Sequence, residues 1–458
     1  MFKKIVYFFN TAKKRFNRTI KPVIKSLKFL PKILGRKEKI LLMVLGLVIV
    51  IAGVFIWQRH WVKTTHPVPN YGGTYVEGIV GQPKDLDKHL SRLTGAGLTR
   101  FDESGNVVAD LAESWQILDD GKTYQFKIRP GYSANDLLAQ IQVKNDWSSI
   151  DASAPDDSTL VFKFKGSFSP FLYISTEPIF TNGPYQITHE EPNQVTLEPS
   201  PGYWQGKPYI SKIQINLYSD FNALTQAAKH GDLTGYLKNA ESDYQMANAS
   251  TQSYALPRQL DLFFNLSKPD LADVNLRRSL RDGQAIGKNL NLVLAVADDA
   301  KDKQIAENLK QRWQSLGVTI DIKTYSNVDL QKTVIPNRDY DLLLYGEDYG
   351  PDPDPYPFWH SSQSGASGSN LSNYSNKKAD KLLEDARQSF DAATRNQKYQ
   401  DFNQILTDDV PYINIEKTTC YYVISNDVQG VGQLYGISEA DRFLNINHWY
   451  LKTKRVKN

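Results

Sequence analysis

The chain has 458 residues, of which 41% are hydrophobic and 23% charged, as in an ordinary globular protein. This composition excludes a disordered tail protein, a collagen-like fibre and a polytopic membrane protein. At about 150 residues per domain, the length predicts about three domains. The single cysteine, Cys420, excludes a disulfide framework and any cysteine-rich zinc or iron–sulfur site.

The charge is divided unevenly along the chain. Residues 1–39 hold 13 Lys or Arg and one acid, Glu38, which gives +12. The whole chain is +4, so residues 40–458 carry −8. A mildly acidic body has no general attraction for nucleic acid, and none is expected as a partner. The N-terminal segment is interpreted as a basic cytoplasmic tail, which either lies on the anionic inner leaflet or only enforces topology.

A membrane span is predicted at residues 40–57, whose sequence is ILLMVLGLVIVIAGVFIW. These 18 residues carry no charge and are long enough to cross a hydrocarbon core. Lys39 and Arg59 bound the run, and Trp57 and Trp61 lie where interfacial aromatic residues gather. The basic excess on the N-terminal side predicts that this side is cytoplasmic and that residues 60–458 are extracellular.

The apolar run is interpreted as an uncleaved, single-pass anchor in the cell membrane. A cleaved signal peptide would need a basic region of 39 residues, and no A-x-A site follows the run. No cysteine follows it closely enough to accept a lipid, since the only cysteine is Cys420.

After a predicted short linker at residues 58–70, the first half of the extracellular part is rich in strands. Alternating apolar and polar residues predict five strands, at 73–80, 124–129, 159–165, 195–198 and 213–217. Residues 71–258 are therefore expected to form a β-rich lobe.

The second half has a different pattern. An apolar strand at 292–297 is followed by a helix at 299–316, with Ile305, Leu309 and Trp313 at helical spacing. Further elements are predicted in the order strand 318–323, helix 328–334, strand 340–345, helix 377–390 and helix 395–407. The β-α-β-α-β order favours a parallel sheet with crossover helices, so the fold class is mixed α/β with two unlike lobes.

No motif of bond chemistry or cofactor binding is present in the sequence. It contains no Walker loop, no G-x-G-x-x-G and no H-E-x-x-H, and its seven histidines never take metal-ligand spacing. The run GASGS at 365–369 departs from G-x-S-x-G and lies in a polar loop. We therefore expect no enzyme activity, no catalytic residue, no metal site and no cofactor.

The most informative loop, LYGEDYGPDPDPYPF at residues 344–358, leaves the carboxyl end of a predicted parallel strand. Open α/β sheets place their ligand crevice at such ends. Its acids can present a carboxylate to a cationic group, or form a rigid turn that faces water. A calcium loop lacks the EF-hand spacing, and sequence spacing alone does not support a glycosidase acid pair.

An ordered series of motifs resembles the family 5 extracellular solute-binding proteins, the oligopeptide, dipeptide and nickel-binding group of ABC importers. The series spans about residues 71–458, and its members are GGTYVEGIVGQPKDL at 72–86, GLTRFDESGNVVADLAESW at 97–115, DDGKTYQF at 119–126, NGPY at 182–185, GYWQGKPYISKI at 202–213, FNL at 264–266, LRRSL at 276–280 and DYGPDPD at 348–354.

The resemblance implies a two-lobed clamp, like a periplasmic binding protein, behind one N-terminal transmembrane helix. Lobe I would comprise residues 71–258 and 424–458, and lobe II residues 259–423, with hinge strands near 260–264 and 413–423. The implied function is to capture an oligopeptide or other small-molecule ligand for an ABC permease in the same membrane.

The resemblance also implies a binding residue. Asp348 matches the family aspartate that pairs with the free α-ammonium group of a peptide. Glu347, Tyr349, Tyr356, Phe358 and Trp359 are expected to line the crevice with it, and for each aromatic the alternative is packing in the core. Asp352 and Asp354 are expected to be turn residues that face solvent.

The chain departs from the family pattern by being shorter in several places. The segments after Arg129-Pro130-Gly131, between 171 and 183, and after 286 are all compressed. A trimmed clamp of this kind leaves two alternatives open: a tethered surface hydrolase of peptides or glycans, and a scaffold or sensor of the same fold that does not transport.

Overall fold

The structure, a computed structural model, describes residues 35–457 except 145–146, 148–149, 241 and 353. The N-terminal part of the basic tail thus lies outside the described residues. The described residues divide into two compact units, one made of residues 35–69 and 453–457 and the other of the described part of 70–452.

The first unit contains helix α4 (Arg36–Thr64) and a two-stranded sheet of β1 (Thr65–Asn70) and β18 (Lys452–Lys457). The apolar side chains of α4 are exposed, and Met43–Thr64 has the length and the mean hydropathy, 1.8, of a segment that could cross a membrane. The helix runs beyond residue 57 to Thr64. Residues 65–70 of the expected linker form strand β1.

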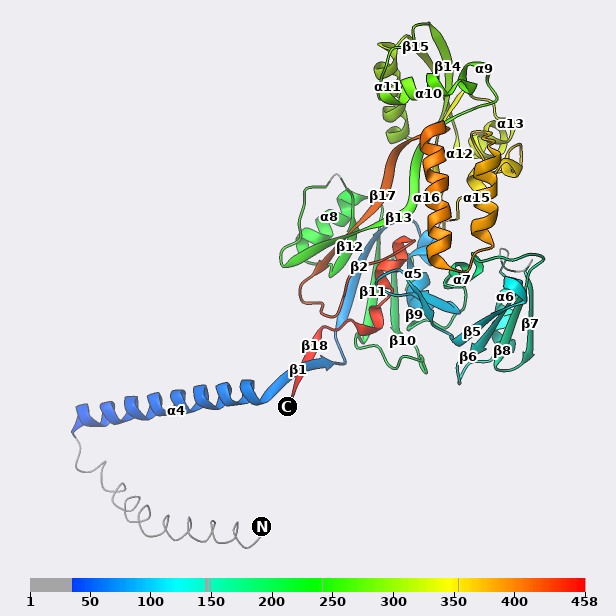
Figure 1. The fold of residues 1–458 in the computed structure, drawn as a ribbon. Coiled ribbons are helices and arrows are strands. Elements are labelled where there is room, and N and C mark those ends of the chain that lie inside the picture. The colour runs from blue at the N-terminus through cyan, green and yellow to red at the C-terminus, as the bar shows by residue number, and fades with distance from the viewer. Residues whose placement is uncertain (1–34, 145–146, 148–149, 241, 353, 458) are drawn as a thin grey trace. The chain divides into compact units, whose positions relative to one another are not determined.

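The second unit is built on one sheet of ten described strands, in the order β15-β14-β16-β13-β17-β12-β2-β11-β10-β9 (Figure 1). Two of these strands are long and lie in the middle of the order, namely β13 (Ala249–Phe264) and β17 (Tyr412–Ser425). The strands on their two sides belong to different hydrophobic cores. We call the side that contains β2 lobe I and the side that contains β14 lobe II.

Lobe I has two parts. The elements on the large sheet are β2 (Thr74–Val80), α5 (Leu86–Thr94), β9 (Tyr185–Glu191), β10 (Gln194–Pro199), β11 (Lys212–Tyr218), α8 (Phe221–His230) and β12 (Gly235–Lys238). The second part contains a hairpin, a separate four-stranded sheet and two helices. The hairpin is formed by β3 (Thr99–Phe101) and β4 (Val107–Ala109), and the sheet by β5 (Ala112–Leu118), β6 (Thr123–Ile128), β8 (Thr159–Lys163) and β7 (Asp151–Asp156). The helices are α6 (Ala134–Gln142) and α7 (Phe171–Ile174).

A buried ion pair holds the C-terminal segment to lobe I. Glu77 on β2 and Arg442 are both fully buried, and Arg442 Nε donates to Glu77 Oε1 at 2.7 Å. The hydroxyl groups of Tyr75 and Tyr422 donate to Glu77 Oε2 at 2.6 and 3.0 Å. A buried carboxylate is tolerated only when it is paired and hydrogen-bonded in this way. The short helix η6 (Glu439–Phe443) is thereby fixed beside β2.

Lobe II is a three-layer α/β/α arrangement. Its elements are α9 (Pro269–Ala272), α10 (Val274–Asp282), β14 (Leu290–Ala297), α11 (Ala300–Gln314), β15 (Val318–Tyr325), α12 (Asn327–Asp329), α13 (Ile335–Asn337), β16 (Leu342–Asp348), α14 (Tyr356–Trp359), α15 (Lys377–Arg387) and α16 (Ala392–Asp409). β14 pairs in parallel with both β15 and β16, which confirms the predicted parallel sheet.

Both faces of the lobe II sheet are covered, which explains the continuous apolar strands. Leu294 and Leu344 pack on the side of α10 and α11, whereas Leu343 packs on the side of α15 and α16. Helix α11 begins at its N-cap Asp299, whose side chain accepts from the amides of Lys301 and Asp302. The mixed α/β, two-lobed fold class predicted from the sequence is confirmed.

The pairing of β13 with β17 is irregular at the point where it passes between the lobes. The strands are antiparallel from Ala249↔Ser425 to Phe263↔Tyr412, with register shifts between Ala255 and Gln259 and between Leu260 and Asp261. Such bulges bend a strand and interrupt its ladder.

Two carboxyl groups are buried beside these bulges. Asp261 is fully buried and accepts from the side-chain amides of Gln259 and Asn414, both at 2.8 Å. Glu347 is 4% exposed and accepts from the Tyr349 hydroxyl at 3.2 Å, while its Oε1 has no partner in the described part of the chain. Burial raises the pKa of Asp261 to about 6. Burial, together with the charge of Asp261, raises the pKa of Glu347.

This cluster predicts a particular pH dependence of stability. Both carboxyls bind protons more tightly in the folded chain than in the unfolded chain, so the stability that they contribute is fully present at low pH and is lost as pH rises, for Asp261 through about 6. Glu347→Gln replaces this carboxyl by a neutral amide, so the variant need neither bury a charge nor take up a proton at this position when it folds near neutral pH. It should raise the free energy of unfolding by about 1–2 kcal/mol near pH 7.5 and change it little near pH 4.

Urea unfolding of a chain that begins at Thr65, followed at both pH values, measures this difference. The control is Glu307→Gln, because Glu307 is exposed on α11 and should show no such pH-dependent gain. A loss of stability at neutral pH in Glu347→Gln would contradict the assignment.

Candidate functional site

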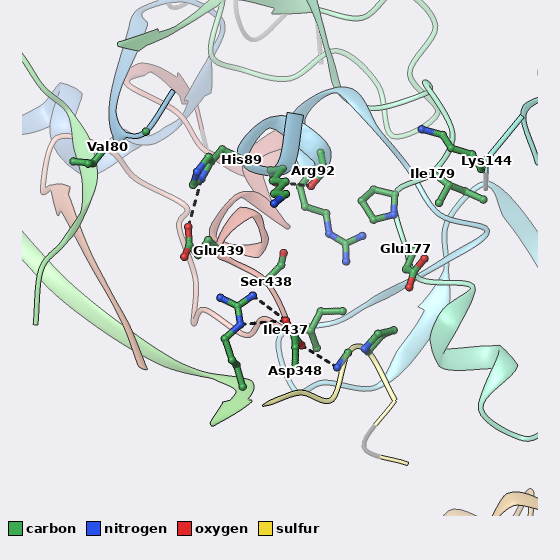
Figure 2. Close-up of a pocket in the computed structure, with 17 residues that line it drawn as sticks. Val80, His89, Arg92, Lys144, Glu177, Ile179, Asp348, Ile437, Ser438 and Glu439 are labelled. Atoms are coloured by element: carbon green, nitrogen blue, oxygen red, sulfur yellow. Dashed lines mark hydrogen bonds and ion pairs between the residues drawn. The ribbon is translucent and has the colours of Figure 1, made fainter. Parts of the chain in front are cut away.

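A cavity of about 660 Å³ lies between the two lobes (Figure 2). Lobe I contributes residues of α5, of the turn 177–179 and of the segment 437–439. Asp348, Gly350 and Pro351 contribute from lobe II, and Arg258 from the crossover strand β13. This volume falls within the range of small-molecule sites, about 300–1,000 Å³.

An ion pair between β13 and β16 forms the lobe II wall of the cavity. Arg258 and Asp348 are register partners, and Arg258 Nε and Nη2 donate to Asp348 Oδ2 at 3.1 and 2.8 Å. The amide of Gly350 donates to Oδ1 at 3.0 Å. The two side chains are 45% and 46% exposed, so water screens their attraction and the pair itself stabilises the fold by less than about 1 kcal/mol.

Helix α5 supplies the opposite wall and brings three basic side chains. Arg92 is buried, and it donates to Asp441 Oδ1 at 2.5 Å and to the Thr176 carbonyl at 2.7 Å. His89 Nδ1 lies 3.5 Å from Glu439 Oε2. Lys88 is exposed at the cavity and has no ion pair with the described residues.

The third side of the cavity is polar as well. Lys144 follows α6 and is exposed, again without an ion pair among the residues that the structure describes. Glu177 accepts from Trp147 Nε1 at 3.1 Å through its Oε2. The cavity therefore combines a carboxylate that is already paired, Asp348, with two lysine ammonium groups that form no ion pair with the described residues.

Of the six side chains predicted to form the site, Asp348 alone is among the cavity-lining residues. Glu347 directly precedes Asp348 on β16, so its side chain points to the opposite face of the sheet, into the cluster with Asp261. Tyr349 donates to Glu347 and packs on Phe358, with ring centroids 4.6 Å apart.

The other two aromatics are also occupied within lobe II. Trp359 is buried in the core, where it packs on Tyr412 at 4.8 Å between centroids. Tyr356 stacks on His360 at 4.1 Å, and the guanidinium of Arg387 lies 3.8 Å from its centroid. For Trp359, core packing is the alternative that the structure supports.

The expectation that Asp352 and Asp354 face solvent is wrong. Both are buried, at 5% and 6% exposure. Both oxygens of Asp352 accept from Arg395 Nη2, at 2.5 and 2.6 Å, and Asp354 Oδ2 accepts from Arg387 Nε at 2.6 Å. The loop packs against α15 and α16, whose arginines are 43 and 33 residues away in the chain.

Sequence reasoning missed Arg258, Lys88 and Lys144 as cavity residues. Arg258 had a possible signal, since it follows Pro257 in an otherwise alternating strand and so marks a break in the ladder. Lys88 and Lys144 had none, because an exposed lysine on a helix or after one is ordinary. Within the described ranges, no group of three or more His, Cys, Asp or Glu side chains could hold a metal ion.

Comparison with known proteins gives consistent results. The family model for bacterial extracellular solute-binding proteins, family 5 middle, matches residues 135–282. The oligopeptide-binding protein AppA of Bacillus subtilis is 21% identical, over 91% of this chain and 99% of that protein.

Two solved structures have the same fold. HbpA2 from Haemophilus parasuis matches with a TM-score of 0.69 and 17% identity, over 78% of this chain and 96% of that chain. The oligopeptide-binding protein AppA from Bacillus subtilis, in complex with a nonapeptide, matches with a TM-score of 0.63 and 19% identity, over 84% and 100%. The family match over residues 135–282, the relatives and the shared two-lobed fold lead to one conclusion: this chain is similar to the family 5 bacterial extracellular solute-binding proteins in its middle segment and shares the fold of the solved structures across both lobes.

Proposed function

We propose that the chain is the substrate-binding component of an ABC importer, which captures short peptides in the cavity between its lobes and delivers them to a permease in the same membrane. The observation that carries this proposal is the cavity itself, which residues of both lobes line together with Arg258 of β13. The similarity to AppA of Bacillus subtilis, an oligopeptide-binding protein, supports peptides as the ligand class. Binding of this kind involves no bond chemistry.

We propose further that Asp348 receives the α-ammonium group of the peptide. Its Oδ2 is held by Arg258, and its Oδ1 accepts a single hydrogen bond from the described residues, donated by the Gly350 amide. Since the pair is half exposed, an ammonium group can share the carboxylate or displace the guanidinium at low cost. Arg258, Lys88 and Lys144 would then be available for the carboxylate end of a short zwitterionic ligand.

The anchor and the lobe boundaries complete the proposal. Helix α4 would span the cell membrane once, with residues 1–39 cytoplasmic and the body outside. Residues 71–258 and 424–458 would move as lobe I and residues 259–423 as lobe II. The bulges of β13 would absorb the change of backbone angles when the lobes close.

Asp348→Asn tests the binding residue, because it keeps the size of the side chain and removes its charge. A hydrogen bond to a charged group contributes about 1.5–3 kcal/mol, so the affinity for a free-amine peptide should fall about ten- to hundredfold. Titration calorimetry with a panel of di- to pentapeptides identifies the tightest ligand and measures this change. The N-acetylated form of that ligand should bind weakly and respond little to the substitution.

The matched control is Asp298→Asn, because Asp298 is an exposed, ion-paired aspartate of lobe II that lies outside the cavity. It should leave the affinity unchanged. Equal affinity of Asp348→Asn and the unsubstituted chain for the free-amine peptide would refute the role of Asp348, and absence of binding by the whole panel would favour the scaffold or sensor alternative.

Closure of the lobes is a separate prediction. A saturating peptide should reduce the radius of gyration measured by small-angle X-ray scattering, because the lobes can rotate about β13 and β17. Asp348→Asn at the same peptide concentration should stay near the open value, and should contract only when the concentration is raised to saturation. A radius unchanged by a ligand whose binding is verified would indicate a rigid scaffold.

A further inference from the structure

The C-terminal strand β18 lies at the end of helix α4, in the same compact unit. Arg455 on this strand donates to the carbonyls of Val62 and Thr65 at 3.1 and 2.7 Å, and its Nε donates to Thr65 Oγ1 at 2.8 Å. The last carbonyls of a helix lack intrahelical partners and carry partial negative charge, which a guanidinium satisfies. Residues almost 400 positions apart in the chain are thus joined where the apolar helix ends.

This junction is strongly basic. Its charged side chains within the first unit are those of Arg59, Lys63, Lys454, Arg455 and Lys457, and no Asp or Glu occurs in residues 39–69 or 453–458. All five side chains are exposed. We call the pair of strands β1 and β18, together with residues 58–64 of α4, the basic collar.

The collar lies close to where a membrane surface would be. Trp57 and Trp61 stack at 5.9 Å between centroids on the outer end of α4, a position typical of an interfacial anchor. From Trp57 to Thr64 the helix rises by seven residue steps, about 10 Å. Since the polar layer on each side of the hydrocarbon core is about 5–8 Å thick, the strands begin at its outer edge, within a Debye length of about 8 Å.

We propose that the basic collar binds anionic phospholipid headgroups on the side of the membrane where the body of the protein lies. This inference rests on the proposed membrane span of α4. Exposed lysines at this distance attract phosphate charge, and each charge adds to the attraction. Lys454 and Lys457 lie on a strand that Arg455 attaches to the helix end, so lipid binding would restrain the chain just before the body begins.

The full chain, reconstituted in lipid nanodiscs of neutral phosphatidylcholine with or without phosphatidylglycerol, tests the collar. Acylation of individual lysine amines, followed by mass spectrometry, reports their accessibility. Phosphatidylglycerol should slow acylation of Lys454 and Lys457 about fivefold. Salt at about 1 M, where the Debye length is about 3 Å, should abolish this protection. Lys163 and Lys165 on the body are exposed internal references and should not change.

A second measurement uses the variant Lys454→Gln with Lys457→Gln, against the control Lys163→Gln with Lys165→Gln. The full chain is purified from mixed-lipid discs after partial delipidation, and the amount of phosphatidylglycerol that remains bound to it is measured. This amount should fall in the first variant and stay unchanged in the second. Retention of both variants in discs after a carbonate wash tests the membrane span of α4 independently of the collar. Loss of retention refutes the span, whereas retention without any phosphatidylglycerol effect refutes the collar.

Two further outcomes also overturn the proposal. Equal protection in neutral and anionic discs would mean that the lysines are shielded by something other than lipid charge. Equal protection by soluble polyphosphate, added to neutral discs at the same phosphate concentration, would mean that the collar adsorbs any polyanion and does not select a lipid surface.

Discussion

The antiparallel pairing of β13 with β17 is the interaction on which the rest of the body depends. These strands join segments about 150 residues apart and extend the sheet of lobe I into lobe II. Because the two lobes share these strands and have separate cores, each can stay rigid while the bulged stretch bends. The same irregular stretch of β13 places Arg258 at the cavity and Asp261 in the interior.

The strand alternation of β16 separates two kinds of carboxylate chemistry within two residues. Asp348 faces the cavity, stays half exposed and is paired with Arg258. Glu347 faces the interior, where burial favours its protonated form. A ligand that changes the bend at the bulges would act on both, since the pair and the buried cluster share strands β13 and β16. Ligand binding and the protonation of the buried carboxyls are therefore expected to influence each other through the position of these strands.

The acidic, proline-rich loop after β16 illustrates what a local pattern can and cannot predict. Its place at the carboxyl end of a parallel strand predicted that it reaches the cavity, and Asp348, Gly350 and Pro351 do. Asp352 and Asp354 have the same local chemistry but are buried against Arg395 and Arg387. Nothing in the loop distinguishes these acids, because the arginines that decide their burial belong to helices that follow much later in the chain.

The sequence by itself determined the apolar helix, the order of strands and helices in lobe II and the mixed two-lobed fold, because hydrophobic periodicity and an ordered series of motifs are local signals. The tertiary structure alone decided which charges meet. It paired Arg258 with Asp348, buried Asp261 beside Glu347 and brought Lys454, Arg455 and Lys457 to the end of α4. Charge pairing and burial depend on which distant segments the fold places side by side, and no periodicity within either segment carries that information.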